Sequence, residues 1–114
     1  MPAYIIATIT VTDWDQYKEY VRHAPRVVRM FGGRFLSRGS EPFMLEGPAV
    51  PKRVVLLEFP TLAIAKAFFA SEAYAAIKRL RDGAADAQFF VIDGYPIAEW
   101  ERAAAESEKL APPV

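Results

Sequence analysis

The sequence contains no cysteine and only one histidine, His23. Without cysteine the chain cannot form a disulfide, bind a metal through thiolates or use a thiol nucleophile. A single histidine also makes a transition-metal site unfavourable, and no spacing of carboxylates suggests a site for another metal. The chain also has no glycine-rich phosphate loop and no serine-nucleophile motif. We therefore expect neither a metal nor a cofactor.

Net charge is absent as well. Fourteen basic residues balance fourteen acidic ones, so electrostatics give no reason to expect binding to nucleic acid or to an anionic membrane surface. No segment approaches the ~20 consecutive apolar residues of a membrane-spanning helix. The apolar start of the chain lacks the basic residues that precede the core of a secretory signal. These absences predict a cytoplasmic protein.

What the chain does contain is apolar and periodic. It has 114 residues, of which 53% are hydrophobic, and this suits one globular domain. Runs rich in β-branched and aromatic residues predict four strands, and apolar residues at helical spacing predict the helices between them. The expected strands are 4–11, 34–39, 53–59 and 87–94, and the expected helices are 13–31, 62–70 and 72–82.

The first helix carries a start signal and a potential break. Thr12 is a good N-cap residue, and Gly32 with Gly33 ends the element. Pro25 lies inside the helical pattern, where it lacks the amide that would bond to Val21. The sequence therefore predicts a kink or a break at Pro25.

The order β-α-β-β-α-β predicts an α+β protein with the ferredoxin-like fold, in which the helices cover one face of a four-stranded antiparallel sheet. Residues 1–94 would form this domain. Residues 95–114 would add a C-terminal helical extension with a frayed end. Ile97, Trp100, Ala104 and Leu110 would face inward on the extension.

The strands are apolar on both faces, and helices can cover only one of them. The other face would carry Ile6, Val54 and Leu56. At ~25 cal/mol per Å² its burial is worth several kcal/mol. The simplest cover is the same face of a second subunit, so we expect a two-fold homodimer, a dimeric α+β barrel.

The stretch "GGRFLSRG" places two arginines on one short strand of an otherwise apolar chain. On a regular strand, Arg34, Leu36 and Arg38 share one face. If the strand pairs antiparallel with 53–59, Arg34 lies opposite Glu58, and we predict a salt bridge between them near the subunit interface. Arg38 would lie opposite Val54, free to reach Glu46 or an anion in an open cavity.

The same motifs, read together, resemble a known group. "GGRFLSRG", "LEG", "RVVLLEFP", "FFASEAY" and a strand ending in "DG" are similar to the bacterial family DUF1330, within the dimeric α+β barrel superfamily. The resemblance covers residues 3 to 94 and implies the fold and the sheet-to-sheet dimer already expected, with no established activity. The positions that match the family pattern are Tyr17, Gly33, Arg34, Phe35, Arg38, Gly39, Glu46, Gly47, Glu58, Phe59, Pro60, Ser71 and Tyr74.

The chain departs from the family pattern at Phe69 and Ala70, where a tyrosine and a polar amide are common. A pocket that used those polar groups would be altered. Some relatives in the superfamily degrade haem with a set of asparagine, tryptophan and histidine. This chain contains no asparagine, so that set cannot be complete.

Candidate ligand-binding residues come from the tyrosines and from the charges on the strands. We expect Tyr17, Arg38, Glu58 and Tyr74 to line a pocket between helices and sheet. Weaker candidates are Tyr20, His23, Arg34 and Glu46. The alternative is structural: most aromatic side chains fill cores, and a lone histidine on a helix is usually a surface residue rather than a general base.

Three functions remain open. The first is a homodimeric protein that binds a small organic molecule, with cofactor-independent catalysis as an extension. The alternative is a non-catalytic dimerisation or protein-interaction module. A metabolite-sensing regulatory domain is a third possibility, although no DNA-binding element accompanies it. A cavity lined by the four leading residues would favour the first function, and a filled core the second.

Overall fold

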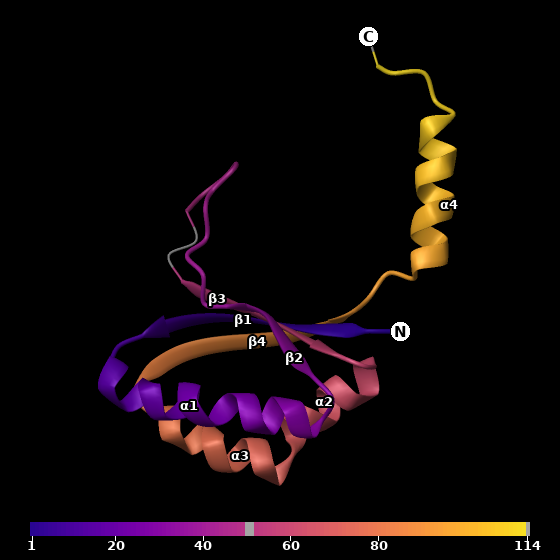
Figure 1. Ribbon diagram of the computed structural model, residues 1–114. Coiled ribbons are helices and arrows are strands. Elements are labelled where there is room, and N and C mark those ends of the chain that lie inside the picture. Colours follow the sequence, from indigo (N-terminus) through magenta and orange to yellow (C-terminus); the bar gives the residue numbers. More distant parts are fainter. Residues whose placement is uncertain (50–51, 114) are drawn as a thin grey trace.

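The computed structural model describes residues 1–49 and 52–113 (Figure 1). Its elements follow the predicted order and confirm the α+β class. They are β1 (Ala3–Val11), α1 (Trp14–Met30), β2 (Arg34–Arg38), β3 (Arg53–Phe59), α2 (Leu62–Ala70), α3 (Glu72–Lys78), the short 3₁₀ helix η1 (Arg79–Arg81), β4 (Ala85–Asp93) and α4 (Ile97–Glu108).

The four strands form one antiparallel sheet in the order β2-β3-β1-β4. Helices α1, α2 and α3 lie together on one face of this sheet, below it in Figure 1. In the described part of the chain, no helix packs directly against the other face. We call these the helix face and the open face. The ferredoxin-like fold expected from the sequence is confirmed.

Strand β1 shows why the sheet has this architecture. Its odd-numbered residues from Ala3 to Ile9 are buried against the helices, and its even-numbered residues from Tyr4 to Thr10 are half-buried on the open face. This alternation follows from the two-residue period of a strand. The core therefore lies in one layer, between the sheet and α1–α3, where Tyr17, Phe59, Phe68 and Tyr74 are among its largest buried side chains.

Helix α1 differs from the prediction at two points. Its N-cap is Asp13 rather than Thr12, and the Asp13 carboxylate accepts a hydrogen bond from the amide of Gln16. The helix also runs through Pro25 without a break. The predicted break was therefore wrong. The reason lies in β2, which supplies the hydrogen-bond donor that proline lacks.

Strand β2 contains a β-bulge that the sequence pattern did not reveal. Arg34 pairs with Glu58 and Phe35 with Leu57, but the register then shifts, so that Ser37 pairs with Leu56 and Arg38 with Val55. A one-residue shift moves every later side chain to the opposite face. Arg34 therefore belongs to the open face and Arg38 to the helix face. The predictions that the two share a face and that Arg38 lies opposite Val54 were wrong.

The remaining boundaries differ only slightly from expectation. The helix predicted over 72–82 ends as an α-helix at Lys78 and continues as η1. Strand β4 begins at Ala85, two residues before the predicted start at 87. No strand forms within 40–49.

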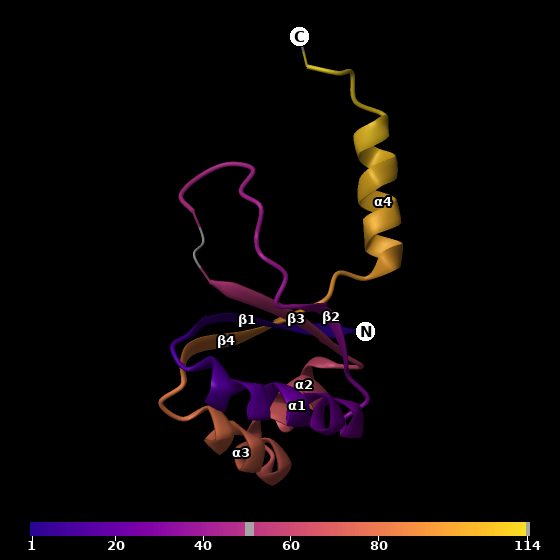
Figure 2. The same cartoon turned by 60° about the vertical axis from the view of Figure 1, so that its left-hand side comes forward.

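Helix α4 stands apart from the layered domain. It rises on the open-face side, as does the loop 40–49, in both views (Figures 1 and 2). None of its residues is buried, and Ile97, Trp100 and Leu110, which were expected to face inward, are exposed. The radius of gyration is 17.4 Å, against about 13 Å for a compact chain of this length. This surplus reflects a helix and a loop that extend away from their own domain.

Candidate functional site

A pocket lies between α1 and the helix face of β1, β2 and β3, and we call it the arginine pocket. Its walls are mostly apolar and aromatic, and its two charged members are both guanidinium groups. It contains Ala7, Ile9, Tyr17, Tyr20, Val21, Ala24, Val28, Phe35, Arg38, Arg53, Val55, Leu57, Phe68 and Phe89. The cavity has a volume of about 30 Å³, which is room for one or two water molecules.

Arg38 reaches the pocket because of the bulge in β2, and it contacts α1 at the point where Pro25 leaves a gap. In an α-helix the carbonyl of Val21 would accept a hydrogen bond from the amide of residue 25, but proline has none. The Arg38 guanidinium donates to that carbonyl instead, with Nη2 2.6 Å from the Val21 oxygen. This bond explains how the helix continues through Pro25, and it ties β2 to α1.

Arg53 approaches the same pocket from the first residue of β3. Its guanidinium packs against the backbone at Gly39, where a Cβ atom would collide with it, and Gly39 also has φ +83°. Arg53 Nη2 donates to the Arg38 carbonyl at 3.4 Å, and the guanidinium lies 5.7 Å from the centre of the Trp14 ring. Its Nε is buried and has no hydrogen-bond partner in the described residues.

The charge of the pocket is not balanced locally. None of its lining residues is acidic, and within the described chain neither Arg38 nor Arg53 forms a salt bridge, since the ion pairs involve other residues. Burial raises the pKa of Tyr17, and the positive charges of Arg53 and Arg81 partly oppose this. The site therefore presents two cations and neutral tyrosine, an environment suited to an anion.

Behind the pocket lies a buried hydrogen-bonded group formed by Tyr20, Tyr74 and Arg81. The hydroxyls of Tyr20 and Tyr74 are 2.7 Å apart, and Arg81 Nη2 donates to the Tyr74 hydroxyl at 3.4 Å. The guanidinium carbon of Arg81 lies 5.3 Å from the centre of the Tyr20 ring and 5.1 Å from that of Phe89. Of the three members, only Tyr20 lines the pocket.

The structure separates the four leading residues predicted for the pocket. Tyr17 and Arg38 line it, and Tyr74 lies behind Tyr20. Glu58 is on the opposite face of the sheet, because it alternates with Leu57, which is buried in the core. A single cavity formed by all four was therefore the wrong arrangement.

Arg34 and Glu58 instead form the predicted salt bridge. Arg34 Nε lies 3.1 Å from Glu58 Oε1, and 27% of the Glu58 side chain remains exposed. The structural alternative thus accounts for Arg34 and Glu58. Glu46 lies exposed in the loop, and Arg38 points to α1 rather than toward it.

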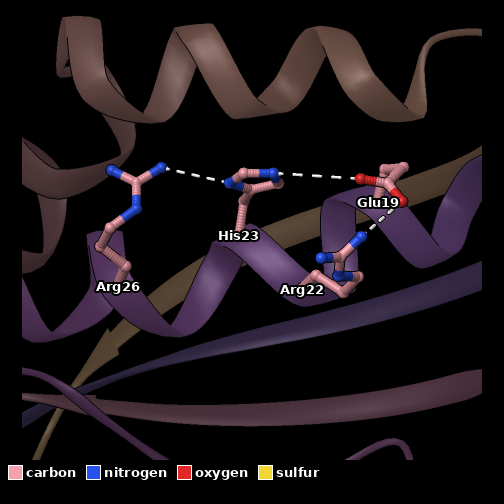
Figure 3. Close-up of polar contacts among 4 residues, drawn as sticks. All are labelled: Glu19, Arg22, His23 and Arg26. Carbon is pink, nitrogen blue, oxygen red and sulfur yellow. Dashed lines mark hydrogen bonds and ion pairs between the residues drawn. The ribbon is translucent and has the colours of Figure 1, made fainter.

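His23 belongs to an exposed group on α1, shown in Figure 3. Its Nε2 is 4.0 Å from Glu19, its Nδ1 is 3.3 Å from Arg26, and Glu19 also pairs with Arg22 at 2.9 Å. His23 does not line the pocket. The geometry agrees with the surface interpretation of this histidine and gives no support to a general base.

A second hollow, of about 200 Å³, lies between α2 and β4. Phe69 and Ala70, the positions where the chain departs from the family pattern, line it together with Ile5, Phe90 and Val91. Lys66 is its one charged member. The hollow offers apolar contact but little that would orient a polar ligand.

Sequence reasoning missed Arg53 and Arg81. Arg53 begins a strand and Arg81 lies in "KRLRDG", and both patterns are typical of solvated residues. A weak signal for Arg53 was available in Gly39, which precedes the loop on the neighbouring strand and leaves the space that the guanidinium fills. For Arg81 the sequence offers none, because its burial depends on how η1 packs against α1.

The described residues contain no group of three potential metal ligands. Within 1–49 and 52–113, no helix combines the length and the apolar character needed to cross a membrane.

Comparison with known proteins gives a family and a fold. The model of a domain of unknown function (DUF1330) matches residues 2–95. A search of curated protein sequences finds no significant match.

Several solved structures share the fold. A protein of unknown function from Rhodopseudomonas palustris, RPA0582, superposes with a TM-score of 0.65 and 19% identity, over 83% of each chain. A dimeric ferredoxin-like protein of unknown function from Thermobifida fusca gives a TM-score of 0.56 at 12% identity, over 82% of this chain and 92% of the other. A variant of SnoaB, a cofactor-independent oxygenase from Streptomyces nogalater, gives 0.57 at 10% identity, over 83% and 94%.

Proposed function

The chain belongs to the DUF1330 family, and we propose that this member is a homodimer that binds a small organic anion in the arginine pocket. One observation carries the ligand class: Arg38 and Arg53 are the charged residues of an otherwise apolar and aromatic pocket, with no carboxylate among the lining residues. A guanidinium matches a carboxylate in shape and can bind it through two hydrogen bonds. Phe35, Tyr17 and Phe89 would contact a flat apolar body.

The ligand must displace part of the present pocket wall. A cavity of about 30 Å³ is far below the ~300 Å³ at which typical ligand sites begin. Arg38 is the side chain that can move, because it is exposed and one hydrogen bond, to the Val21 carbonyl, holds it on α1. Rotation of the Arg38 guanidinium toward solvent would open the pocket. The same rotation would bring the guanidinium to the carboxylate of an entering ligand.

The proposal is tested by thermal unfolding with a panel of small aromatic and aliphatic carboxylates, each paired with its neutral amide. A ligand that binds only the folded state stabilises it by about 2.7 kcal/mol at a hundred times its Kd. Carboxylates should raise Tm and their amides should not. Arg53→Gln should remove the rise, whereas Arg29→Gln, an exposed position outside the pocket on α1, should keep it. If no carboxylate raises Tm, the non-catalytic interaction module becomes the better interpretation.

The homodimer is supported by the open face. Leu56, Ile6 and Phe90 pair across three adjacent strands and form an apolar row there, and 46% of Phe90 remains exposed. The loop 40–49 and α4 rise on the same side (Figure 2), where they would flank a second copy. The similar Thermobifida fusca protein is described as dimeric and ferredoxin-like.

Catalysis is an extension of this proposal. The similar SnoaB is described as a cofactor-independent oxygenase, so a reaction that needs no bound cofactor is the one to test first on any ligand that binds. A metabolite sensor would use the same pocket without turnover. Whether it acts as an enzyme or as a sensor, we propose that the protein works in the cytoplasm.

A further inference from the structure

Arg81 carries a buried charge without a counter-ion. It is 8% exposed, its Nε has no hydrogen-bond partner in the described residues, and the ion pairs found there do not include it. A buried guanidinium cannot escape the cost of desolvation by losing its proton. The Tyr20 and Phe89 rings lie against it, and the Tyr74 hydroxyl accepts one of its hydrogens. Those contacts hold the charge in place but do not neutralise it.

The hydrogen bonds around Arg81 have a defined direction. A guanidinium only donates, so the Tyr74 oxygen accepts from Arg81. In the 2.7 Å bond between Tyr74 and Tyr20, either hydroxyl can be the donor. If Tyr20 donated, the hydrogen of Tyr74 would be left without an acceptor among the described residues, at a side chain that is 1% exposed. If Tyr74 donates, the free hydrogen belongs to Tyr20, which lines the pocket.

We infer that Tyr20 is a hydrogen-bond donor at the inner wall of the arginine pocket and that Arg81 polarises it through Tyr74. The ligand is then an acid with a second oxygen, a carbonyl or a phenolate oxygen, which accepts the hydrogen bond from Tyr20. This inference rests on the proposed function, since the carboxylate of the same ligand lies between Arg38 and Arg53 at the outer end of the arginine pocket. Each bond in a chain of hydroxyls strengthens the next, and the positive charge at its end favours negative charge on the ligand oxygen.

Tyr20 is protonated, as a hydrogen-bond donor must be. Burial, together with the neighbouring Tyr74, raises the pKa of Tyr20 well above its usual value, and the positive charge of Arg81 partly opposes this rise. The hydroxyl therefore keeps its proton throughout the physiological range and donates it to a hydrogen bond without releasing it. Tyr74 and Arg81 act through Tyr20 and are positioning residues.

The probe for this site is 4-hydroxy-3-nitrobenzoate, which combines a carboxylate with a phenol whose ionisation changes its visible absorption. Binding next to the polarised donor should stabilise the phenolate and lower the pH at which the bound probe ionises by about one unit, a tenfold change in the ionisation constant. Tyr20→Phe should abolish this shift with little loss of carboxylate affinity. Tyr95→Phe, an exposed tyrosine outside the pocket, should keep it.

The outcomes separate the two levels of the proposal. If neither the probe nor any carboxylate of the panel binds, the proposed function fails. If carboxylates of the panel raise Tm but the probe does not bind, the second-oxygen site is overturned while the proposed function stands. A different result is that the probe binds and that Arg53→Gln weakens this binding. If the probe then ionises at the same pH in solution, in the wild type and in Tyr20→Phe, the donor role of Tyr20 is overturned. Arg81→Gln, which keeps the Tyr20 hydroxyl, should lose most of the shift. A full shift in that variant would overturn the role of the buried charge.

Discussion

The two arginines of β2 have different roles because one extra residue stands between their pairing positions. Arg34 pairs with Glu58 on the open face, and Arg38 bonds to α1 on the helix face. The register near Arg34 could be predicted, because Arg34 and Glu58 are complementary and the strands are antiparallel. The bulge at Leu36 could not, because neither glycine nor any other bulge signal marks that position. The pocket contains Arg38 only as a result of this bulge.

Burial of Tyr20 predicts a particular loss of stability at alkaline pH. The pKa of Tyr20 is higher in the folded chain than its ordinary value of about 10, so the folded state binds the proton more tightly than the unfolded state. The free energy of unfolding is then unaffected below about pH 10 and falls as the pH rises above it. Urea unfolding at pH 8 and pH 11 measures this fall.

Tyr20→Phe should make that alkaline fall smaller, and Tyr95→Phe, at a side chain that is 62% exposed, should leave it as in the wild type. An identical fall in Tyr20→Phe and wild type would show that the Tyr20 hydroxyl is not held in its neutral form by folding.

Among the elements, α1 shows what the sequence can and cannot specify. Its extent follows from apolar periodicity and from the glycines after it, and both were predicted. Its passage through Pro25 depends on a donor from β2, thirteen residues further along the chain, which local sequence cannot supply. The buried position of Arg81 has the same origin, since η1 is held to α1 by Gln16, whose amide donates to the carbonyls of Leu80 and Asp82.

The bond between Arg38 and Val21 predicts an energetic coupling with Pro25. In Pro25→Ala, the alanine amide can donate to the Val21 carbonyl, so Arg38 is no longer needed there. Arg38→Ala should therefore destabilise the wild type more than it destabilises Pro25→Ala, by about 0.5–1.5 kcal/mol, the usual contribution of one hydrogen bond. Denaturant unfolding of the four proteins in this cycle measures the coupling. Additive effects would mean that Arg38 does not replace the missing amide.

On the scale of the whole molecule, the layered fold was predictable and the placement of α4 was not. The apolar strand pattern and the order of the elements predicted the sheet, with helices on one face only, from sequence alone. The contacts of α4 cannot be inferred in this way, because its apolar residues have no surface of their own chain to cover them. Ile97, Trp100 and Leu110 are between 57% and 76% exposed. We propose that residues 1–94 form the folded domain and that 95–114 contact the second subunit.

The proposed dimer predicts that a charge on the open face would disrupt assembly. Sedimentation of the wild type should show about twice the 12.8 kDa of one chain. Phe90→Lys would place an ammonium group in the apolar interface and should give monomers that remain folded. Met30→Lys changes a side chain at the end of α1 that is more exposed, 61% against 46% for Phe90, and should remain dimeric. A wild type that sediments as a compact monomer at micromolar concentration would contradict the dimer.

The salt bridge of the open face should matter mainly for assembly. A partly exposed ion pair contributes at most about 1 kcal/mol to the stability of one chain, whereas an unpaired charge at an interface costs about 1–3 kcal/mol. Glu58→Gln should therefore weaken dimerisation more than it lowers the unfolding free energy of the monomer. Sedimentation equilibrium with denaturant unfolding separates the two effects. Unchanged dimerisation would place this pair outside the interface.

The most direct test of the central claim is a crystal structure of the protein soaked with the carboxylate that raises Tm most. We predict that the carboxylate lies between the guanidinium groups of Arg38 and Arg53, with Arg38 moved from the Val21 carbonyl and the body of the ligand against Phe35 and Tyr17. A ligand bound elsewhere, with Arg38 still on Val21 and the pocket closed, would contradict it.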